Sequence, residues 1–323
     1  MALNKKNSVS RITALLSKYS IFVILVGVFV ISALLNKNFV TVTNLTNILR
    51  QNSVVAILAF GETMLIIAGL LDLASGAVLA FAGVLSIFVY KATGNMPLAL
   101  AVGFIIGVAF NALSGLLVSV YKTPPFIATL AVTTIARGSV LLFTAGQNIY
   151  QIGNYIVFGQ GKIGFIPNPV IFMALMLAVS WYILNHTRFG RSLYAIGGNA
   201  EAANASGINV PRTQFLCYLL NGFLVGLAGI IFMSRVNGGM PNAASGYEFE
   251  ALTAAIIGGT SFSGGIGTAM GTLAGAFIVG IINNIMNLLE VNSYMQQIIK
   301  GCIIALAVIM DIYAKNKRSR PKA

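Results

Sequence analysis

Long apolar runs, separated by short polar stretches, recur along almost the whole chain of 323 residues. A helix needs about 20 mostly apolar residues to cross the hydrocarbon core of a bilayer, and most of these runs reach that length. We therefore expect each run to form one membrane-spanning helix. The clearest runs lie between Lys18 and Lys37, Arg50 and Asp72, Asp72 and Lys91, Met96 and Tyr121, Phe126 and Ala145, Pro169 and Leu184, Arg212 and Arg235, and Tyr294 and Tyr313.

The stretch from Ala251 to Leu289 contains no charged residue and is too long for a single span. It is interrupted by the Gly-rich sequence GGTSFSGG at residues 258–265. We expect a short span, a Gly-rich break and then a full span, which brings the total to about ten. Whether residues 251–265 cross the membrane completely or only re-enter it is left open by the sequence.

Composition narrows the class of protein. Hydrophobic residues make up 57% of the chain and charged residues only 8%, whereas soluble domains carry roughly 25% charged residues. The pattern predicts an all-α, polytopic membrane protein with a single domain over residues 1–323. The net charge of +13 does not indicate a nucleic-acid binder, because the basic residues are scattered and concentrate at the two ends of the chain.

The distribution of lysine and arginine predicts the orientation. With the N-terminus inside, thirteen of the twenty lie in cytoplasmic segments and five in external ones, as expected for a multi-pass membrane protein. The main predicted cytoplasmic segments are residues 1–18, the loop at 185–213 and the basic tail at 314–323, and Lys122 lies in a further short cytoplasmic loop. Both termini are then cytoplasmic, which requires an even number of crossings and favours ten over nine.

Two Gly-interrupted segments, residues 69–76 and 258–267, lie in opposite halves of the chain. Interrupted spans in both halves of a transporter indicate a transport site, because irregular backbone at membrane depth is tolerated only inside protein or beside a cavity. Polar residues near these segments are candidates for a translocation pathway. They are Asp72, Ser75, Thr260, Ser261, Asn283, Asn284 and Asn287. Asn283 and Asn287 share a helical face, although the asparagines could equally bond only to neighbouring helices.

Three charged residues, Glu62, Arg137 and Lys300, fall within predicted spans. Charges at membrane depth are costly, so each either serves the pathway or forms an ion pair inside the bundle. Small residues also form a pattern in the second half of the chain. Gly267, Gly271 and Gly275 are expected to form one helix face that allows close packing, either within the chain or between two copies.

The loop at 185–213 carries its own helix signals. Asn199 is a good N-cap, Glu201 suits the positive end of a helix, and Gly207 can supply the left-handed stop. Such a short helix is marginal in water and must be held by docking on this chain or on a partner. We expect this contact to involve Gly197, Gly198, Asn199, Glu201, Ala202, Ala203, Ser206 and Gly207.

Several long motifs resemble the permease subunits of ribose-type bacterial ABC importers, a family that also includes branched-chain amino acid permeases. The matching segments follow the family's order over nearly the whole chain. They read NFVTVTNLTNILRQNS at 38–53, TPPFIATLAVTTIARG at 123–138, HTRFGRSLYAIGGN at 186–199, YAIGGNAEAANASGINV at 194–210 and GYEFEALTAAIIGGTSFSGGIGTAMGTLAGAFIVGIINN at 246–284. In that family the segment after Asn199 is the coupling helix, which contacts the ATPase.

The resemblance implies a non-catalytic subunit of the bacterial inner membrane that imports a monosaccharide. Its expected partners are a separate ATP-binding subunit, which would hold ATP and magnesium, an external sugar-binding protein, and a second permease, either identical or a paralogue. No cofactor or metal is expected on this chain. Alternatives are a permease for nucleosides or branched-chain amino acids, or a secondary transporter that uses Glu62 or Asp72 for proton coupling.

The chain departs from the family pattern at three places. Residues 69–77 read GLLDLASGA where the family usually reads GGIDLSVGS, Glu62 replaces an apolar residue, and Asn204 replaces a position that is often basic. These changes leave the identity of the solute open. Cys217 and Cys302 both lie in apolar runs, and we expect them to be small buried residues.

Overall fold

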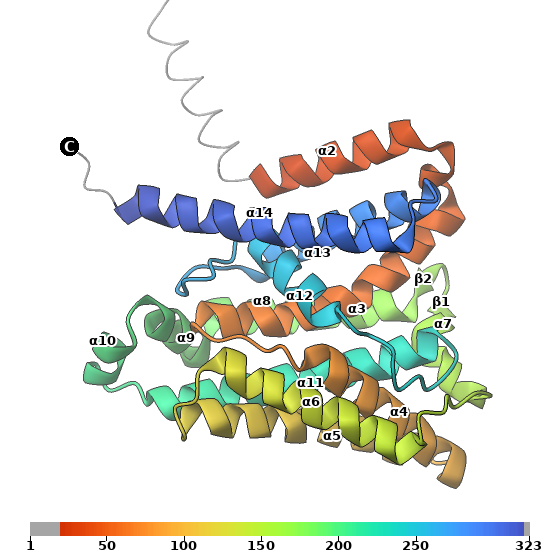
Figure 1. The fold of residues 1–323 in the computed structure, drawn as a ribbon, viewed down its shortest axis with the longest axis horizontal. Helices are drawn as coiled ribbons and strands as arrows, with labels where there is room; N and C mark the ends of the chain where they lie inside the picture. The colour runs from red at the N-terminus through yellow and green to blue at the C-terminus, as the bar shows by residue number, and fades with distance from the viewer. Residues whose placement is uncertain (1–19, 320–323) are drawn as a thin grey trace, which may run out of the picture.

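The computed structural model describes residues 20–319, with the backbone alone for residues 314–319. The predicted N-terminal segment 1–18 and the last four residues of the tail therefore lie outside the described residues. The described chain is helical apart from one small hairpin (Figure 1). Its long helices are α2 (Ser20–Leu35), α3 (Val42–Ile67), α4 (Ser75–Thr93), α5 (Met96–Ser119), α6 (Pro125–Thr144), α8 (Asn168–His186), α11 (Val210–Arg235), α13 (Ala269–Leu288) and α14 (Ser293–Ser319).

Shorter elements connect the long helices. They are the 3-10 helices η1 (Lys37–Val40) and η2 (Gly153–Ile156), the helices α7 (Val157–Gln160), α9 (Arg188–Gly198), α10 (Ala200–Ala205) and α12 (Tyr247–Ile257), and the strands β1 (Lys162–Ile163) and β2 (Ile166–Pro167). The two strands pair antiparallel, with Lys162 opposite Pro167.

Polar caps define where several long helices begin. The side chains of Thr41, Asn95 and Asn209 accept hydrogen bonds from the backbone at the starts of α3, α5 and α11, as N-cap residues do. α4 ends at Gly94, whose φ of 68° supplies the left-handed stop. The apolar runs thus supply the length of the helices, and the polar residues between them set the ends.

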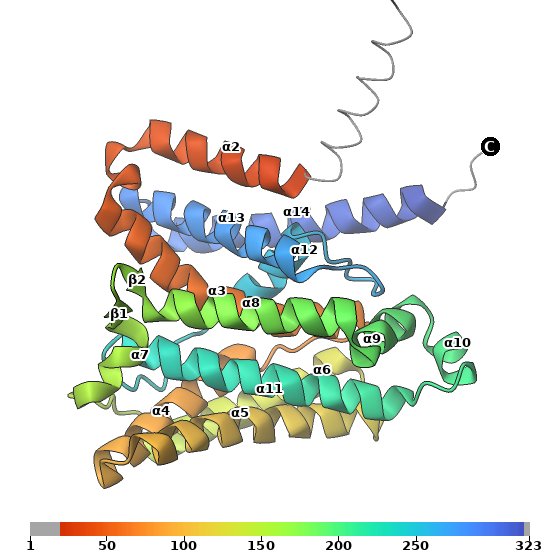
Figure 2. The same ribbon diagram turned by 180° about the vertical axis from the view of Figure 1, so that it is seen from behind.

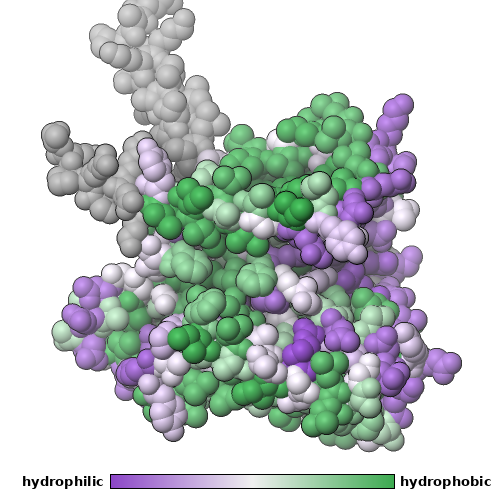
Figure 3. All heavy atoms as spheres, in the orientation of Figure 1, coloured by the Kyte–Doolittle hydropathy of each residue, from purple (hydrophilic) through white to green (hydrophobic). Residues whose placement is uncertain are grey.

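The long helices lie side by side, and most short elements gather at the two ends of the bundle, whereas α12 lies between the ends (Figures 1 and 2). α9 and α10 lie at one end, together with the start of α2 and the C-terminal end of α14; we call this the α10 end. The hairpin β1–β2 and α7 lie at the opposite end, the hairpin end. Hydrophilic residues concentrate toward these two ends, with an apolar band between them (Figure 3).

α11 is the central helix and packs against α3, α4 and α5. Glycines allow the close approach. An added Cβ at Gly107 would collide with the backbone of Gly222, and one at Gly83 would collide with the carbonyl oxygen of Gly229. By contrast, α14 is hardly buried along its apolar window. The core therefore lies around α3, α4, α11 and the buried side of α13, and α14 covers one side.

Seven of the described helices are long and apolar enough to cross a membrane. They are α4, α5, α6, α8, α11, α13 and α14. α2 has 16 residues and α12 only 11, while α3 is long but carries polar residues such as Arg50 and Asn52 within it. The expected multi-pass helical architecture is present.

Both predicted interruptions are present. α3 ends at Ile67, and the chain is non-helical until α4 begins at Ser75, with Gly69 at a φ of 75°. A second break follows α12, where Gly259, Gly264 and Gly265 all have positive φ. Such backbone conformations favour glycine because it has no Cβ.

Three details differ from the sequence-based expectations. The segment Arg188–Gly198, expected to be loop, forms the helix α9 capped by Thr187. Gly267 precedes the N-cap Thr268, so it does not share the α13 face with Gly271 and Gly275. Cys302 is exposed rather than buried, because it lies on the peripheral helix α14.

Candidate functional site: a coupling end and a cavity within the bundle

The predicted short helix is present as α10, with the predicted caps. The Oδ1 atom of Asn199 accepts a hydrogen bond of 2.9 Å from the backbone N–H of Ala202. Gly207 adopts a φ of 85°, and the Ile208 N–H donates to the carbonyl oxygen of Ala203. Ala203 is buried, whereas Gly198, Asn199, Glu201, Ala202 and Ser206 are exposed. α10 therefore presents a small, uncovered surface at the tip of the α10 end.

α9 connects this tip to the bundle. Gly197 packs so closely on the end of α3 that an added Cβ would collide with the carbonyl oxygen of Ile67. The same oxygen accepts a hydrogen bond of 2.8 Å from the Gly265 N–H. Three segments therefore meet at one point: α9, the end of α3 and the Gly-rich segment before α13.

Tyr194 adds a second link between α9 and the Gly-rich segment. Its hydroxyl donates a hydrogen bond of 2.7 Å to the carbonyl oxygen of Gly267. Burial raises the pKa of the Tyr194 phenol above its usual value, because the charged form is poorly solvated there. The phenol therefore stays protonated and remains a donor. α9 is therefore linked by close packing to the end of α3 and by a hydrogen bond to the Gly-rich segment.

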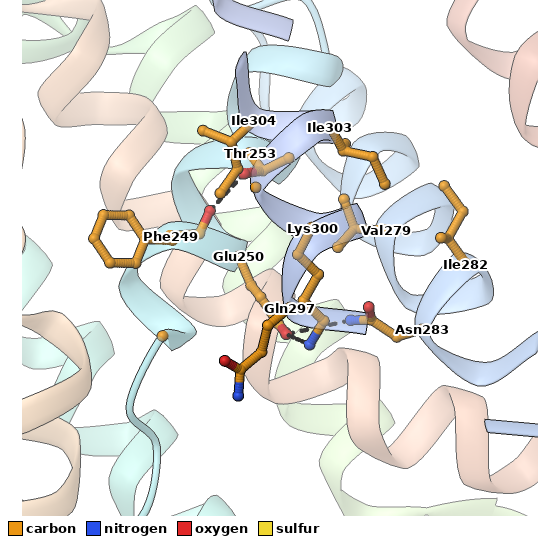
Figure 4. Close-up of a pocket in the computed structure, with 12 residues that line it drawn as sticks. Phe249, Glu250, Thr253, Val279, Ile282, Asn283, Gln297, Lys300, Ile303 and Ile304 are labelled. Carbon is orange, nitrogen blue, oxygen red and sulfur yellow. Dashed lines mark hydrogen bonds and ion pairs between the residues drawn. The ribbon is translucent and has the colours of Figure 1, made fainter. Parts of the chain in front are cut away.

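A cavity of about 220 Å³ lies between α12, α13 and α14. One wall is polar: Lys300 Nζ lies 2.6 Å from Glu250 Oε1, and Asn283 Nδ2 donates to the same oxygen at 3.3 Å (Figure 4). Gln297 lies beside this group. The remaining wall is mostly apolar and includes Phe249, Val279, Ile282, Ile303 and Ile304, together with Thr253.

This mixture of groups suits a small polyhydroxylated ligand. Carboxylate, ammonium and amide groups can bond hydroxyl groups, and the aromatic ring of Phe249 and the aliphatic side chains can cover C–H faces. The charges of Glu250 and Lys300 already compensate each other, so a neutral ligand would meet no unbalanced charge.

A second polar group is buried deeper, at the break between α3 and α4. Ser75 Oγ lies 2.9 Å from Glu62 Oε1 and 2.9 Å from Asp72 Oδ2. Asn221 on α11 donates to Asp72 Oδ2 at 2.8 Å and to Asn111 Oδ1 at 2.9 Å. All five side chains are fully buried. A hydroxyl has one hydrogen, so Ser75 donates to only one of the two carboxyl groups at a time.

The predicted pathway residues therefore do not form one lining. Asp72 and Ser75 belong to the buried group, and Asn283 lines the cavity. Asn284 pairs with Asn44, and Asn287 is exposed and accepts from Gln296.

Thr260 and Ser261 lie in the Gly-rich segment, where Ser261 donates to Asp311 on α14 at 3.2 Å. Thr260 is also buried, and its Oγ1 has no hydrogen-bond partner in the described chain.

The three charges expected at membrane depth have different surroundings. Lys300 forms the ion pair with Glu250. Arg137 instead donates to the backbone carbonyl oxygens of Pro241 and Ala243, and Glu62 lies in the buried polar group. Glu250, Gln297 and Phe249 were missed, since nothing in the sequence pairs Glu250 with a lysine 50 residues away.

The glycines of α13 pack within the chain. An added Cβ at Gly271 would collide with the carbonyl oxygen of Gly258, and one at Gly275 with that of Ala254. Gly267 instead lies against the Ile67 side chain and Thr260. Of the two kinds of contact left open by the sequence, the intrachain one is present.

A multi-pass helical bundle with broken spans and a cavity that has one polar wall is typical of a membrane transport protein. Within residues 20–319, no group of three or more His, Cys, Asp or Glu side chains is placed to hold a metal ion. The chain belongs to the family described as branched-chain amino acid transport system / permease component, which matches residues 44–308.

Individual relatives cover almost the full length. The chain is 40% identical to the ribose import permease protein RbsC of Escherichia coli (strain K12) over 302 residues, which are 92% of this chain and 94% of that protein. It is 41% identical to RbsC of Bacillus subtilis (strain 168), covering 87% and 88%. It is 31% identical to the xylose transport system permease protein XylH of Escherichia coli (strain K12), covering 86% and 87%. No solved structure matches significantly.

Proposed function

We propose that this chain is the membrane permease of an ATP-driven importer of ribose or a closely related monosaccharide. The observation that carries the proposal is the 40% identity to a ribose import permease over 92% of the chain. The cavity between α12, α13 and α14 supports it, because its polar wall offers a carboxylate, an ammonium and amides to a neutral polyol. The permease itself carries no catalytic role, and ATP hydrolysis takes place on a separate subunit.

The proposed topology has ten crossings, with α2, α3 and α12 added to the seven long apolar helices. α12 is short, about 16 Å at 1.5 Å per residue, roughly half of the hydrocarbon core. However, α11 ends beside α7 at the hairpin end, where Gly159 bonds Ser234, and the segment before α13 lies beside α9. Residues 236–268 therefore connect the two ends, which supports one crossing built from α12 and irregular backbone.

Both termini and the segment 185–213 then face the cytoplasm, and the hairpin end faces outward. In this arrangement the exposed surface of α10 docks on the ATPase subunit, and α9 transmits its movement to the two breaks. An external binding protein delivers the sugar at the hairpin end. The working unit contains two permease chains, identical or paralogous, in the inner membrane of a bacterium.

Charge reversal on α10 tests this assignment. We expect Glu201→Lys to uncouple ATP hydrolysis from sugar uptake, because Glu201 lies exposed in the first turn of α10, where a cation opposes the helix dipole. The matched control is Glu290→Lys, the same charge change at an exposed position near the end of α13. The measurement is sugar uptake per ATP hydrolysed in reconstituted vesicles. Equal coupling in both variants would contradict a coupling role for α10.

A further inference from the structure

A polar pocket of about 420 Å³ opens at the hairpin end of the bundle, away from the cavity of Figure 4. Four elements that are distant in sequence form it: the start of α3, the end of α7, the end of α11 and the second half of α13. Arg50 and Arg235 contribute guanidinium groups, and Asn47, Gln51 and Gln160 contribute amides. No acidic side chain lines this pocket.

Both arginines line the pocket and contact α7, Arg50 through its guanidinium group and Arg235 through its backbone. Arg50 donates to the backbone carbonyl oxygen of Gln160 at 3.4 Å, and the Gln160 side chain donates to the carbonyl oxygen of Arg235 at 3.1 Å. The other contacts of Arg235 are also neutral: a long hydrogen bond of 3.4 Å to the Tyr247 hydroxyl and the Phe232 ring, 5.3 Å away. Both guanidinium groups are therefore held in place by uncharged groups.

Neither guanidinium group forms an ion pair with a described side chain. Among the side chains of residues 20–313, the one ion pair joins Lys300 and Glu250. In addition, the Nε atoms of Arg50 and Arg235 are both buried and have no hydrogen-bond partner. A buried donor without a partner is rare in a folded protein and calls for an explanation. An arginine presents its donors in a planar fork that matches carboxylate and phosphate oxygens.

We propose that this pocket binds an oxyanion of the carboxylate or phosphate class. Two arginines that line one pocket without forming an ion pair provide the charge and the fork-shaped donors, and the surrounding amides provide further donors. The oxyanion can come from a free small anion or from an acidic side chain of a protein that docks on this end. That the pocket faces outward rests on the proposed function, whereas the anion chemistry does not.

The test uses the full chain in lipid nanodiscs and two probes, inorganic phosphate and a hexaglutamate peptide. The test variant is Arg50→Gln with Arg235→Gln. Lys162→Gln is the matched control, because Lys162 is an exposed basic residue at the same end of the bundle. Binding is followed by titration calorimetry at low and at high salt.

We expect at least one probe to bind the wild-type chain and the control with equal affinity, and about tenfold more weakly to the double variant. Added salt should weaken the wild-type affinity more than that of the double variant. Binding of phosphate assigns a small-anion site, and binding of the peptide alone assigns a docking site for an acidic protein surface. Absence of binding by both probes, or equal binding by the double variant, would overturn the proposal.

Sugar uptake by the same variants, reconstituted with the ATPase subunit and the external binding protein in proteoliposomes, separates this proposal from the proposed function. Arginine-dependent anion binding by a protein that transports no monosaccharide would refute the transport assignment and keep the anion site. Ribose uptake without any arginine-dependent anion binding would refute the anion site and keep the transport assignment.

Discussion

Asn283 and Asn287 illustrate what single residues contribute. They are one helical turn apart on α13, yet Asn283 is buried beside Glu250 and Lys300, whereas Asn287 is exposed and bonds Gln296. The sequence indicated a shared face, and it could not show that α14 and α12 cover only one of the two positions. Two residues one turn apart on the same helix can therefore have different roles, because different helices pack against them.

This difference yields a prediction for the pathway. Asn283→Leu should lower monosaccharide uptake about tenfold or more while the protein remains in the membrane, because it removes an amide from the polar wall of the cavity. Asn287→Leu, the matched control, should leave uptake within about twofold of the wild type. Uptake and membrane abundance are measured in the same cells. Wild-type uptake by Asn283→Leu, or equal losses in both variants, would remove the cavity from the pathway.

Residues that act through local chemistry were predictable, and those that act through distant partners were not. The caps at Asn199 and Gly207 follow from short-range rules and are present. The pairing of Glu250 with Lys300 depends on how α12 and α14 pack, which local rules do not specify. The same holds for Ser75, which lies between Glu62 and Asp72 only because the chain turns back after α3.

At the scale of helices, length and hydrophobicity predicted most elements. The long helices lie in the expected runs, and both Gly-rich interruptions occur where expected. The sequence of α9 has only a weak local preference for helix, because it has glycines at 190, 197 and 198. Its helix is held by packing: Leu193 and Ile196 are buried, and Gly197 allows contact with the α3 end. Tertiary contacts here outweigh a weak local preference.

Helix packing also gives a prediction. Gly275→Ala should destabilise the protein by roughly 1–3 kcal/mol, because the added methyl would collide with the carbonyl oxygen of Ala254 on α12. Gly301→Ala is the matched control: Gly301 is also helical, but an added Cβ there meets no atom within 4 Å. Thermal unfolding in detergent measures both. If the two variants unfold at the same temperature, α12 and α13 do not pack as described.

At the scale of the whole molecule, the two polar ends and the apolar band match a membrane-embedded bundle (Figure 3). The sequence predicted this architecture because a bilayer requires both apolar length and satisfied backbone hydrogen bonds. It could not predict how α12 and its flanking backbone cross, since 11 helical residues fit neither a full span nor a simple loop.

Labelling of single cysteines tests the orientation. With Cys302 replaced by serine, Asn154→Cys at the hairpin end should react with an impermeant thiol reagent added outside cells. Ala205→Cys on α10 should react only after the membrane is opened. Both positions are exposed in the folded chain, so access across the membrane decides the result. The opposite pattern would invert the proposed topology.

The central claim is that this permease transports a monosaccharide and that ATP hydrolysis on its partner subunit drives the transport. Proteoliposomes that contain the permease, its ATPase subunit and internal ATP, with the external binding protein outside, provide the direct test. We predict uptake of labelled ribose that requires ATP hydrolysis and is competed by unlabelled ribose but not by leucine. Ribose uptake that persists without ATP would contradict the account, and so would competition by leucine but not by unlabelled ribose.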